Sequence, residues 1–229
     1  MEHSLTIGLS AGVFGTRYTS FIPQWWDGVV SLNRQPDTIV FVYDAQNKES
    51  SLASLPEQYK AITNFVEFDG DDFGEFRHLM QTNQTADWFS VCGIDDQYLP
   101  GAFDEIEQAD AEGCDIYIDK VQFKHNGQIL EGRWEPDQIP HRMTCPGAAP
   151  MKLELYNKTG GVTKGTIWDD WELYIRCVAV GAKPYHANTV RIIHDLGYDH
   201  ETLSGVKRNS QNDEIGNAYI AKVRQELGL

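Results

Sequence analysis

Asp87-Trp-Phe-Ser-Val-Cys-Gly-Ile-Asp-Asp96 is the most informative stretch of the chain, because an apolar, β-prone run stops there on two adjacent carboxylates. A strand that ends in paired acids is a common way to hold a divalent cation, since Mg²⁺ and Mn²⁺ take carboxylate oxygens together with substrate phosphates. An Asp-Asp pair is also an ordinary polar turn before a helix, and Tyr98-Leu-Pro100 follows as a helix start. The choice between these two interpretations depends on the acids elsewhere in the chain.

Strand-like runs of apolar, β-branched or aromatic residues occupy four places in the first half of the chain: 4–9, 38–43, 63–68 and 87–92. Between them lie stretches compatible with helices, at about 22–35, 52–61 and 74–84. A further helix is expected near Pro100, because proline suits the first helical turn. Strands that alternate with helices indicate βαβ units, hence an α/β fold with a mostly parallel sheet covered on both faces.

The pattern changes after Gly113. Residues 115–124 alternate apolar and polar side chains, which predicts a strand exposed on one side. Residues 132–166 are rich in proline and glycine and predict a long loop, of a kind that is usually functional in a compact domain. A helix at about 168–181 and a strand at 186–194 follow. A last helix is indicated by an i, i+4 stripe of Ile215, Tyr219, Val223 and Leu227.

The composition limits the classes of function. With 229 residues and 41% hydrophobic content, the chain can form one well-buried domain. A net charge of −15 speaks against sequence-independent binding to nucleic acids or anionic membranes, which needs clustered Lys and Arg. No run approaches the ~18–20 apolar residues of a membrane span. Four scattered cysteines without a Cys-x-x-Cys motif indicate reduced thiols in a cytoplasmic protein.

Acidic residues follow three of the expected strands: Asp44 the second, Asp69, Asp71 and Asp72 the third, and Asp95-Asp96 the fourth. Ligands of open parallel α/β sheets sit beyond the carboxyl ends of the strands. The three strand ends therefore predict a cation site, or a ribose clamp, in a shared crevice. For residues 69–72, a solvated loop is the alternative.

Two further segments bear on chemistry. The loop from Ser10 to Tyr18 has two glycines, so its backbone N–H groups could approach a nucleotide, although a plain turn fits it too. It matches neither a Walker A loop nor a Gly-x-Gly-x-x-Gly fingerprint. Far downstream, Asp169 and Asp170 could be first-turn acids favoured by the helix dipole. Alternatively, one of them is a general base, ionised at neutral pH because the ordinary pKa of Asp is about 3.9.

Taken in order, these pieces resemble the inverting GT-A glycosyltransferases (glycosyltransferase family 2-like), the large family that builds bacterial polysaccharides. The likeness runs from about residue 4 to residue 205 and rests on five segments. They are Leu5 to Ser10, the helix end at Gln35 with the strand Thr38 to Asp44, Gly74 to Arg77, Gly93 to Asp96, and Gly160-Gly161 followed by Asp169 to Arg176.

The resemblance assigns roles to residues at the matching positions. It implies donor contacts from Ser10, Asp44, Arg77 and Asp96. It implies that Asp95 is the principal metal ligand and Asp170 the catalytic base. His194 looks like the late histidine that touches the diphosphate or the metal, and His200 competes for that match; a lone surface histidine is the alternative for either.

The sequence departs from the family pattern at three points. Gly93 occupies the first Asp position of the metal motif Asp-x-Asp-Asp, so one carboxylate contact is missing. Asp169 stands where Glu is usual. The loop after the first strand lacks the common Pro-Thr-Tyr-Asn pattern, which puts the identity of the base in doubt.

The resemblance implies a single GT-A (Rossmann-like) domain at 1–208, with a nucleotide-sugar half at 1–113 and an acceptor-side half at 114–208, then a C-terminal helix at 209–229. The implied activity is hexosyltransferase-like: a sugar passes with inversion from a nucleoside-diphosphate sugar, UDP first, to a hydroxyl, with Mn²⁺ or Mg²⁺. The acceptor stays open among a saccharide, a protein, a small molecule and a modified base. The alternatives are a nucleotidyltransferase and a non-catalytic nucleotide- or sugar-binding module.

Overall fold

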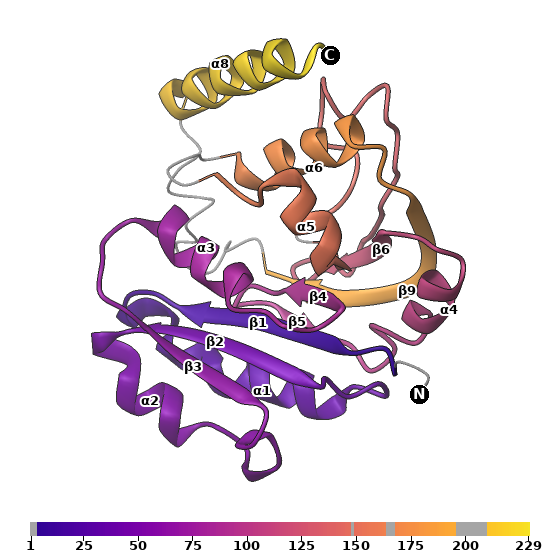
Figure 1. The fold of residues 1–229 in the computed structure, drawn as a ribbon. Coiled ribbons are helices and arrows are strands. Elements are labelled where there is room, and N and C mark those ends of the chain that lie inside the picture. The colour runs from indigo at the N-terminus through magenta and orange to yellow at the C-terminus, as the bar shows by residue number, and fades with distance from the viewer. Residues whose placement is uncertain (1–3, 148, 164–167, 196–209) are drawn as a thin grey trace.

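The computed structural model describes residues 4–147, 149–163, 168–195 and 210–229. These residues form one nine-stranded sheet with the order β3-β2-β1-β4-β8-β6-β9-β5, and β7 pairs with β6 outside this path. Figure 1 shows α1 and α2 on one face of the sheet and α3, α5 and α6 on the other. The helix α8 lies outermost, beyond α6. The α/β fold with helices on both faces is confirmed.

The first half of the sheet is parallel. Its four strands are β1 (Ile7–Val13), β2 (Thr38–Asp44), β3 (Thr63–Phe68) and β4 (Trp88–Val91). These four strands run parallel to one another, so their carboxyl ends lie at one edge of the sheet, as the βαβ pattern predicts. The first strand differs from the prediction of 4–9, because pairing with β2 continues through Val13.

The helices of this half are shorter than expected: α1 (Ile22–Ser31), α2 (Lys48–Ala53) and α3 (Phe73–Thr82). The prediction of a helix at 52–61 is wrong. The helix begins earlier, and Pro56, which cannot continue a helix, separates it from a short 3-10 turn at Glu57–Tyr59. Two further 3-10 turns, at Thr16–Phe21 and Ala45–Asn47, follow β1 and β2.

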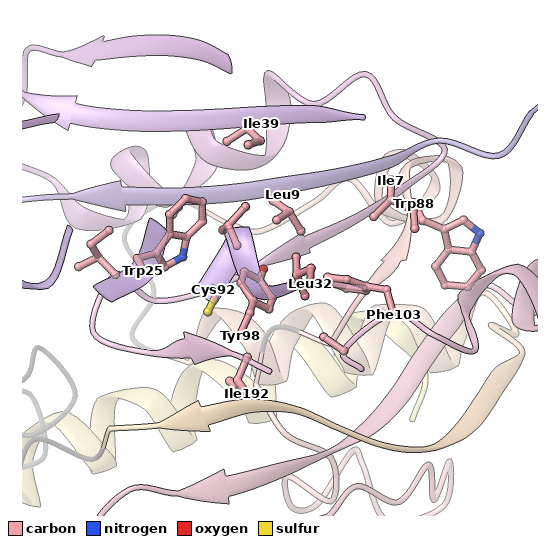
Figure 2. Close-up of a cluster of buried hydrophobic side chains, with 14 of the residues drawn as sticks. Ile7, Leu9, Trp25, Leu32, Ile39, Trp88, Cys92, Tyr98, Phe103 and Ile192 are labelled. Atoms are coloured by element: carbon pink, nitrogen blue, oxygen red, sulfur yellow. The ribbon is translucent and has the colours of Figure 1, made fainter. Parts of the chain in front are cut away.

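A buried aromatic cluster joins α1 to the sheet (Figure 2). Trp25 and Trp26 are almost fully buried, and Trp26 stacks on Phe41 of β2 with ring centroids 5.7 Å apart. Trp25 also meets Tyr98 at 6.3 Å. Burying side chains of this size contributes about 1.5–3 kcal/mol each. These tryptophans are therefore core residues and are not available as stacking faces for a sugar.

The second half of the sheet is mixed. It comprises β5 (Gln97–Tyr98), α4 (Ile106–Ala111), β6 (Ile116–Phe123), β7 (Ile129–Glu131), β8 (Met151–Lys152), α5 (Leu153–Thr159), α6 (Asp169–Ala179), β9 (Pro184–His194) and α8 (Ser210–Leu227). A helix start near Pro100 is wrong: β5 pairs antiparallel with β9 there, and the helix begins at Ile106. A continuous loop over 132–166 is also wrong, because Met151 pairs with Phe89 and α5 follows at once.

The strand β6 is not exposed on one side as the alternation suggests. It lies between β8 and β9, and Ile116 to Asp119 are all buried. The polar side chain of Asp119 is therefore buried with them, whereas Lys120 and Gln122 further along the strand are partly exposed. One consequence is a fully buried carboxylate at Asp119.

The face of α8 that packs also differs from the predicted stripe. Ile220 and Val223 are buried, whereas Ile215 and Leu227 are exposed. Gly216 makes this rotation possible, because a Cβ there would lie 1.5 Å from the indole nitrogen of Trp168. The helix therefore docks on α6 through a glycine notch. None of the helices in the described ranges has the length and apolarity needed to cross a membrane.

Candidate functional site

The loop after β4 and the end of β9 meet at the acid pair. The ring nitrogen Nδ1 of His194 lies 2.7 Å from Asp96 Oδ1, and the backbone N–H of Asp195 donates to the same oxygen at 3.0 Å. Asp96 is only 6% exposed. The structure thus brings together two site residues that are 98 positions apart in sequence.

Asp95 lies beside this contact in an electrostatic environment that disfavours its charge. Burial raises its pKa to about 6, and the negative charge of Asp96 adds to the effect, while its own backbone N–H and His194 oppose it. Burial lowers the pKa of His194, but its hydrogen bond to Asp96 and the two carboxylates outweigh that effect and raise it. Negative charge is therefore in excess here, which favours the approach of a cation.

Gly93 allows the two carboxylates to lie where they do. A Cβ on Gly93 would come 2.7 Å from Asp95 Oδ1 and 3.2 Å from Asp96 Oδ2. Any larger residue would displace the Asp95 carboxylate. Gly93, which stands where the family's metal motif has Asp, thus leaves the space that the Asp95 carboxylate occupies.

The residues of this cluster fit an open cation site and not a closed one. Among the described residues, no group of three or more His, Cys, Asp or Glu side chains could hold a metal ion by itself. Mg²⁺ commonly takes one or two carboxylates and completes its shell with water and substrate phosphates. Asp95 can supply the carboxylate. His194 bonds Asp96 through Nδ1, which orients Nε2 in the way that histidine ligands are usually held.

Asp44 lies at the carboxyl end of β2, and Ser10 lies in the middle of β1. The Asp44 carboxylate accepts hydrogen bonds from the N–H of Gly15 at 2.7 Å and from the backbone and side chain of Asn47. It therefore holds the loop after β1. The Ser10 hydroxyl is fully buried, donates to Met80 O and accepts from Gln84. Ser10 therefore lies inside the sheet, three residues before the carboxyl end of β1, and not at the edge where a donor contact is expected.

Arg77 pairs with both acids of the second cluster. On α3, its guanidinium donates to Asp169 Oδ1 at 2.8 Å and to Asp170 Oδ1. Burial opposes its charge, but the two aspartates prevail and raise its pKa. The family resemblance assigns Arg77 to a contact with the donor and Asp170 to the acceptor side. In the structure the two side chains form an ion pair with each other. Asp170 keeps 27% of its side chain exposed.

The other members of the acceptor-side motif support α6 from within. Glu172 is fully buried and pairs with Arg176 one turn later. It also accepts a hydrogen bond from Thr163 at 2.8 Å. Gly160 adopts φ 80° and ends α5, a conformation that favours glycine. His200, the competitor of His194, lies outside the described residues.

Sequence reasoning misses a buried ion pair between the two acid clusters. Arg191 of β9 and Asp119 of β6 are fully buried and hydrogen-bonded to each other. Burial raises the pKa of Asp119, although Arg191 opposes this. Arg191 also reaches Ser90 Oγ at 3.3 Å and the carbonyl of Gly147 at 3.5 Å. Arg191 lies three residues before His194 on β9. The same strand therefore carries the histidine that meets Asp96 and the arginine that pairs with Asp119 inside the sheet.

The hydroxyl of Ser90 is expected to contribute to stability through this network. It accepts hydrogen bonds from Tyr98 at 3.1 Å and from Arg191. Ser90→Ala should lower the free energy of unfolding by about 1–3 kcal/mol, since it leaves buried donors without an acceptor. Urea denaturation measures the change. Ser31→Ala, at an exposed hydroxyl bonded within its own helix, should stay within about 0.5 kcal/mol of the parent chain; equal effects would contradict the network.

Comparisons with known proteins were made in sequence and in three dimensions. No family model matches the sequence, and no curated protein matches it. The structure is similar to S. aureus TarS 1–349 in complex with UDP-GlcNAc, with a TM-score of 0.72 and 8% identity over 96% of this chain. For the same protein in complex with UDP, the TM-score is 0.64 at 8% identity, again over 96% of this chain.

The chain is shorter than the proteins it resembles. It spans 66% of the TarS 1–349 chain bound to UDP-GlcNAc and 72% of the one bound to UDP. It spans 37% of a longer TarS chain, with a TM-score of 0.63 and 9% identity over 84% of this chain. Such low identity establishes the fold alone, and that fold is a single GT-A-like α/β domain with a mixed, mostly parallel sheet between helices.

Proposed function

We propose that this chain is a glycosyltransferase that transfers a hexose from a nucleoside-diphosphate sugar, first of all a UDP-sugar, to a hydroxyl acceptor. The observation that carries the proposal is the acid–histidine pair at the carboxyl edge of the sheet, where Asp96 meets His194 beside a partly buried Asp95. In α/β sheets of this kind, that edge is where ligands bind. TarS, a GT-A-type glycosyltransferase of similar fold, was solved with UDP and with UDP-GlcNAc.

The donor would bind at the ends of the parallel strands. Asp44 would hold the loop after β1 beside the nucleoside, and Asp95 and His194 would hold the divalent cation. When bound, Mn²⁺ or Mg²⁺ supplies charge neutralisation for the leaving diphosphate. A protein with a net charge of −15 needs such neutralisation to accept an anionic donor. To contact the diphosphate, Arg77 would use another of its five N–H donors or exchange an aspartate partner for a phosphate oxygen.

Asp170 would act as the base. It takes the proton of the acceptor hydroxyl while that oxygen attacks the anomeric carbon from the face opposite the leaving diphosphate, and the configuration inverts. The segment 132–147 would shield the donor from water, which otherwise hydrolyses it. All four cysteines are free and buried, and with their scattered spacing they support placing the protein in the reducing cytoplasm.

Release of UDP from a panel of UDP-sugars, with Mn²⁺ and without it, tests the proposed function. We expect slow, cation-dependent release from at least one donor, starting with UDP-GlcNAc, even with water as the acceptor. A nucleotidyltransferase would instead form pyrophosphate from a nucleoside triphosphate and a sugar phosphate. A binding module would be stabilised by the donor without turning it over. Either of these results would contradict the proposal.

A further inference from the structure

The carboxylate of Asp170 is confined on two sides. One oxygen, Oδ1, is held by Arg77. The other, Oδ2, faces the backbone of Gly147: a Cβ built on Gly147 would lie 2.8 Å from it. A distance under 3.0 Å is shorter than side chains tolerate, so residue 147 must be glycine if Asp170 is to keep this position.

The backbone around Gly147 is tied to the helix that carries Asp170. Tyr174 lies one turn after Asp170 on α6 and is almost fully buried. Its hydroxyl donates to the carbonyl of Pro146 at 2.7 Å and accepts from the N–H of Ala149 at 2.8 Å. A single hydroxyl thus fastens the chain on both sides of Gly147. We call Pro146, Gly147 and Ala149 the Gly147 bracket.

The bracket is also held from the sheet side. Arg191, fixed by its buried ion pair with Asp119, lies with Nη2 3.5 Å from the carbonyl oxygen of Gly147. The ring of Tyr174 is braced by Trp134, at 6.2 Å between ring centroids. The bracket therefore rests on two buried side chains from different elements.

The space behind Asp170 is small. A cavity of about 10 Å³ is at the lower limit for one water molecule. Its lining is mostly apolar and includes Phe89, Val91, Met151 and Leu173 beside Asp170. The Asp170 carboxylate has little room to turn into this cavity. A side chain added at residue 147 would therefore move the carboxylate away from its present direction.

We propose that Gly147 and Tyr174 are positioning residues for Asp170, and that the Gly147 bracket fixes the direction of its carboxylate toward the acceptor. The proposal rests on the proposed function in one respect only, the role of Asp170 as base. A base must lie within hydrogen-bond reach of the proton that it removes, and a misplacement of 1 Å can lower turnover by about 100-fold.

Gly147→Ala and Tyr174→Phe test the catalytic side of the proposal. Both should lower kcat by about 10- to 100-fold while the KM for the UDP-sugar stays within about 2-fold, because the donor site is untouched. Tyr117→Phe is the matched control. It removes another buried tyrosine hydroxyl, bonded to Thr189 on β9, and should lose stability without a comparable fall in kcat. A parallel fall in all three variants would show that the effect is structural and would overturn the proposal.

A double-mutant cycle on thermal stability gives a readout that needs no activity. Gly147→Ala should lower Tm in the parent chain but have much less effect in an Asp170→Ala background, where the opposing carboxylate is gone. Equal Tm losses in the two backgrounds would overturn the bracket.

The outcomes separate the two proposals. If Asp170→Asn turns over normally, the base assignment fails whatever the coupling; if Asp170→Asn is impaired but Gly147→Ala is not, only the bracket fails.

Discussion

Asp170→Asn should reduce UDP release by about 100-fold or more while leaving donor affinity near that of the parent chain. The amide has nearly the volume of the carboxylate, so it can still occupy the space between Arg77 and Gly147. It cannot accept the proton of the attacking hydroxyl. Steady-state kinetics gives the turnover, and calorimetry with UDP and Mn²⁺ gives the affinity.

Asp169→Asn is the control for this change. It removes the same charge from the preceding residue and from the same arginine partner, but from a side chain only 11% exposed, against 27% for Asp170. Its turnover should fall far less than that of Asp170→Asn. If Asp170→Asn turned over normally, Asp170 would not be the base. If the two variants were equally impaired, the loss would belong to the ion pairs with Arg77 and not to a base at Asp170.

Asp95→Ala should abolish cation-dependent donor binding. The side chain supplies the partly exposed carboxylate of the acid pair, whereas Asp96 is buried against His194 and the backbone of Asp195. In the parent chain, UDP with Mn²⁺ at 100 times its Kd should add about 2.7 kcal/mol to the free energy of unfolding. In the variant, the gain in Tm on adding both ligands should vanish.

Asp71→Ala is the matched control for Asp95→Ala. Asp71 also follows a parallel strand, β3, but it is exposed, in keeping with the solvated-loop interpretation of residues 69–72. Its variant should be stabilised by UDP and Mn²⁺ as much as the parent chain. A full thermal shift in Asp95→Ala would contradict the assignment of the cation to this carboxylate.

The longer strands could be predicted because their sequence signal is local. The β-branched and aromatic runs at 38–43 and 63–68 predict strands, and the structure has strands at Thr38–Asp44 and Thr63–Phe68. The short pieces could not be predicted. A two-residue strand such as Gln97–Tyr98 has no periodicity, and only its pairing with Ile192 and Ile193 makes it a strand.

The contacts within the candidate site depend on tertiary packing. Nothing near Arg77 in sequence shows that its partners are 92 and 93 positions away, so a donor contact and a catalytic base were predicted where the structure has an ion pair. The Arg191–Asp119 pair left a weak signal, since each charge interrupts an apolar strand. A charge in such a strand indicates either an exposed face or a buried partner, and only the structure decides between them.

The central claim is that a cation bound by Asp95 carries the donor diphosphate at the carboxyl edge of the sheet. A crystal structure with UDP and Mn²⁺, with the manganese located by its anomalous signal, tests it most directly. We expect the ion bonded to an oxygen of Asp95 and to oxygens of the diphosphate, with His194 beside them. Manganese bound elsewhere, or UDP bound away from the ends of β1, β2 and β4, would contradict the claim.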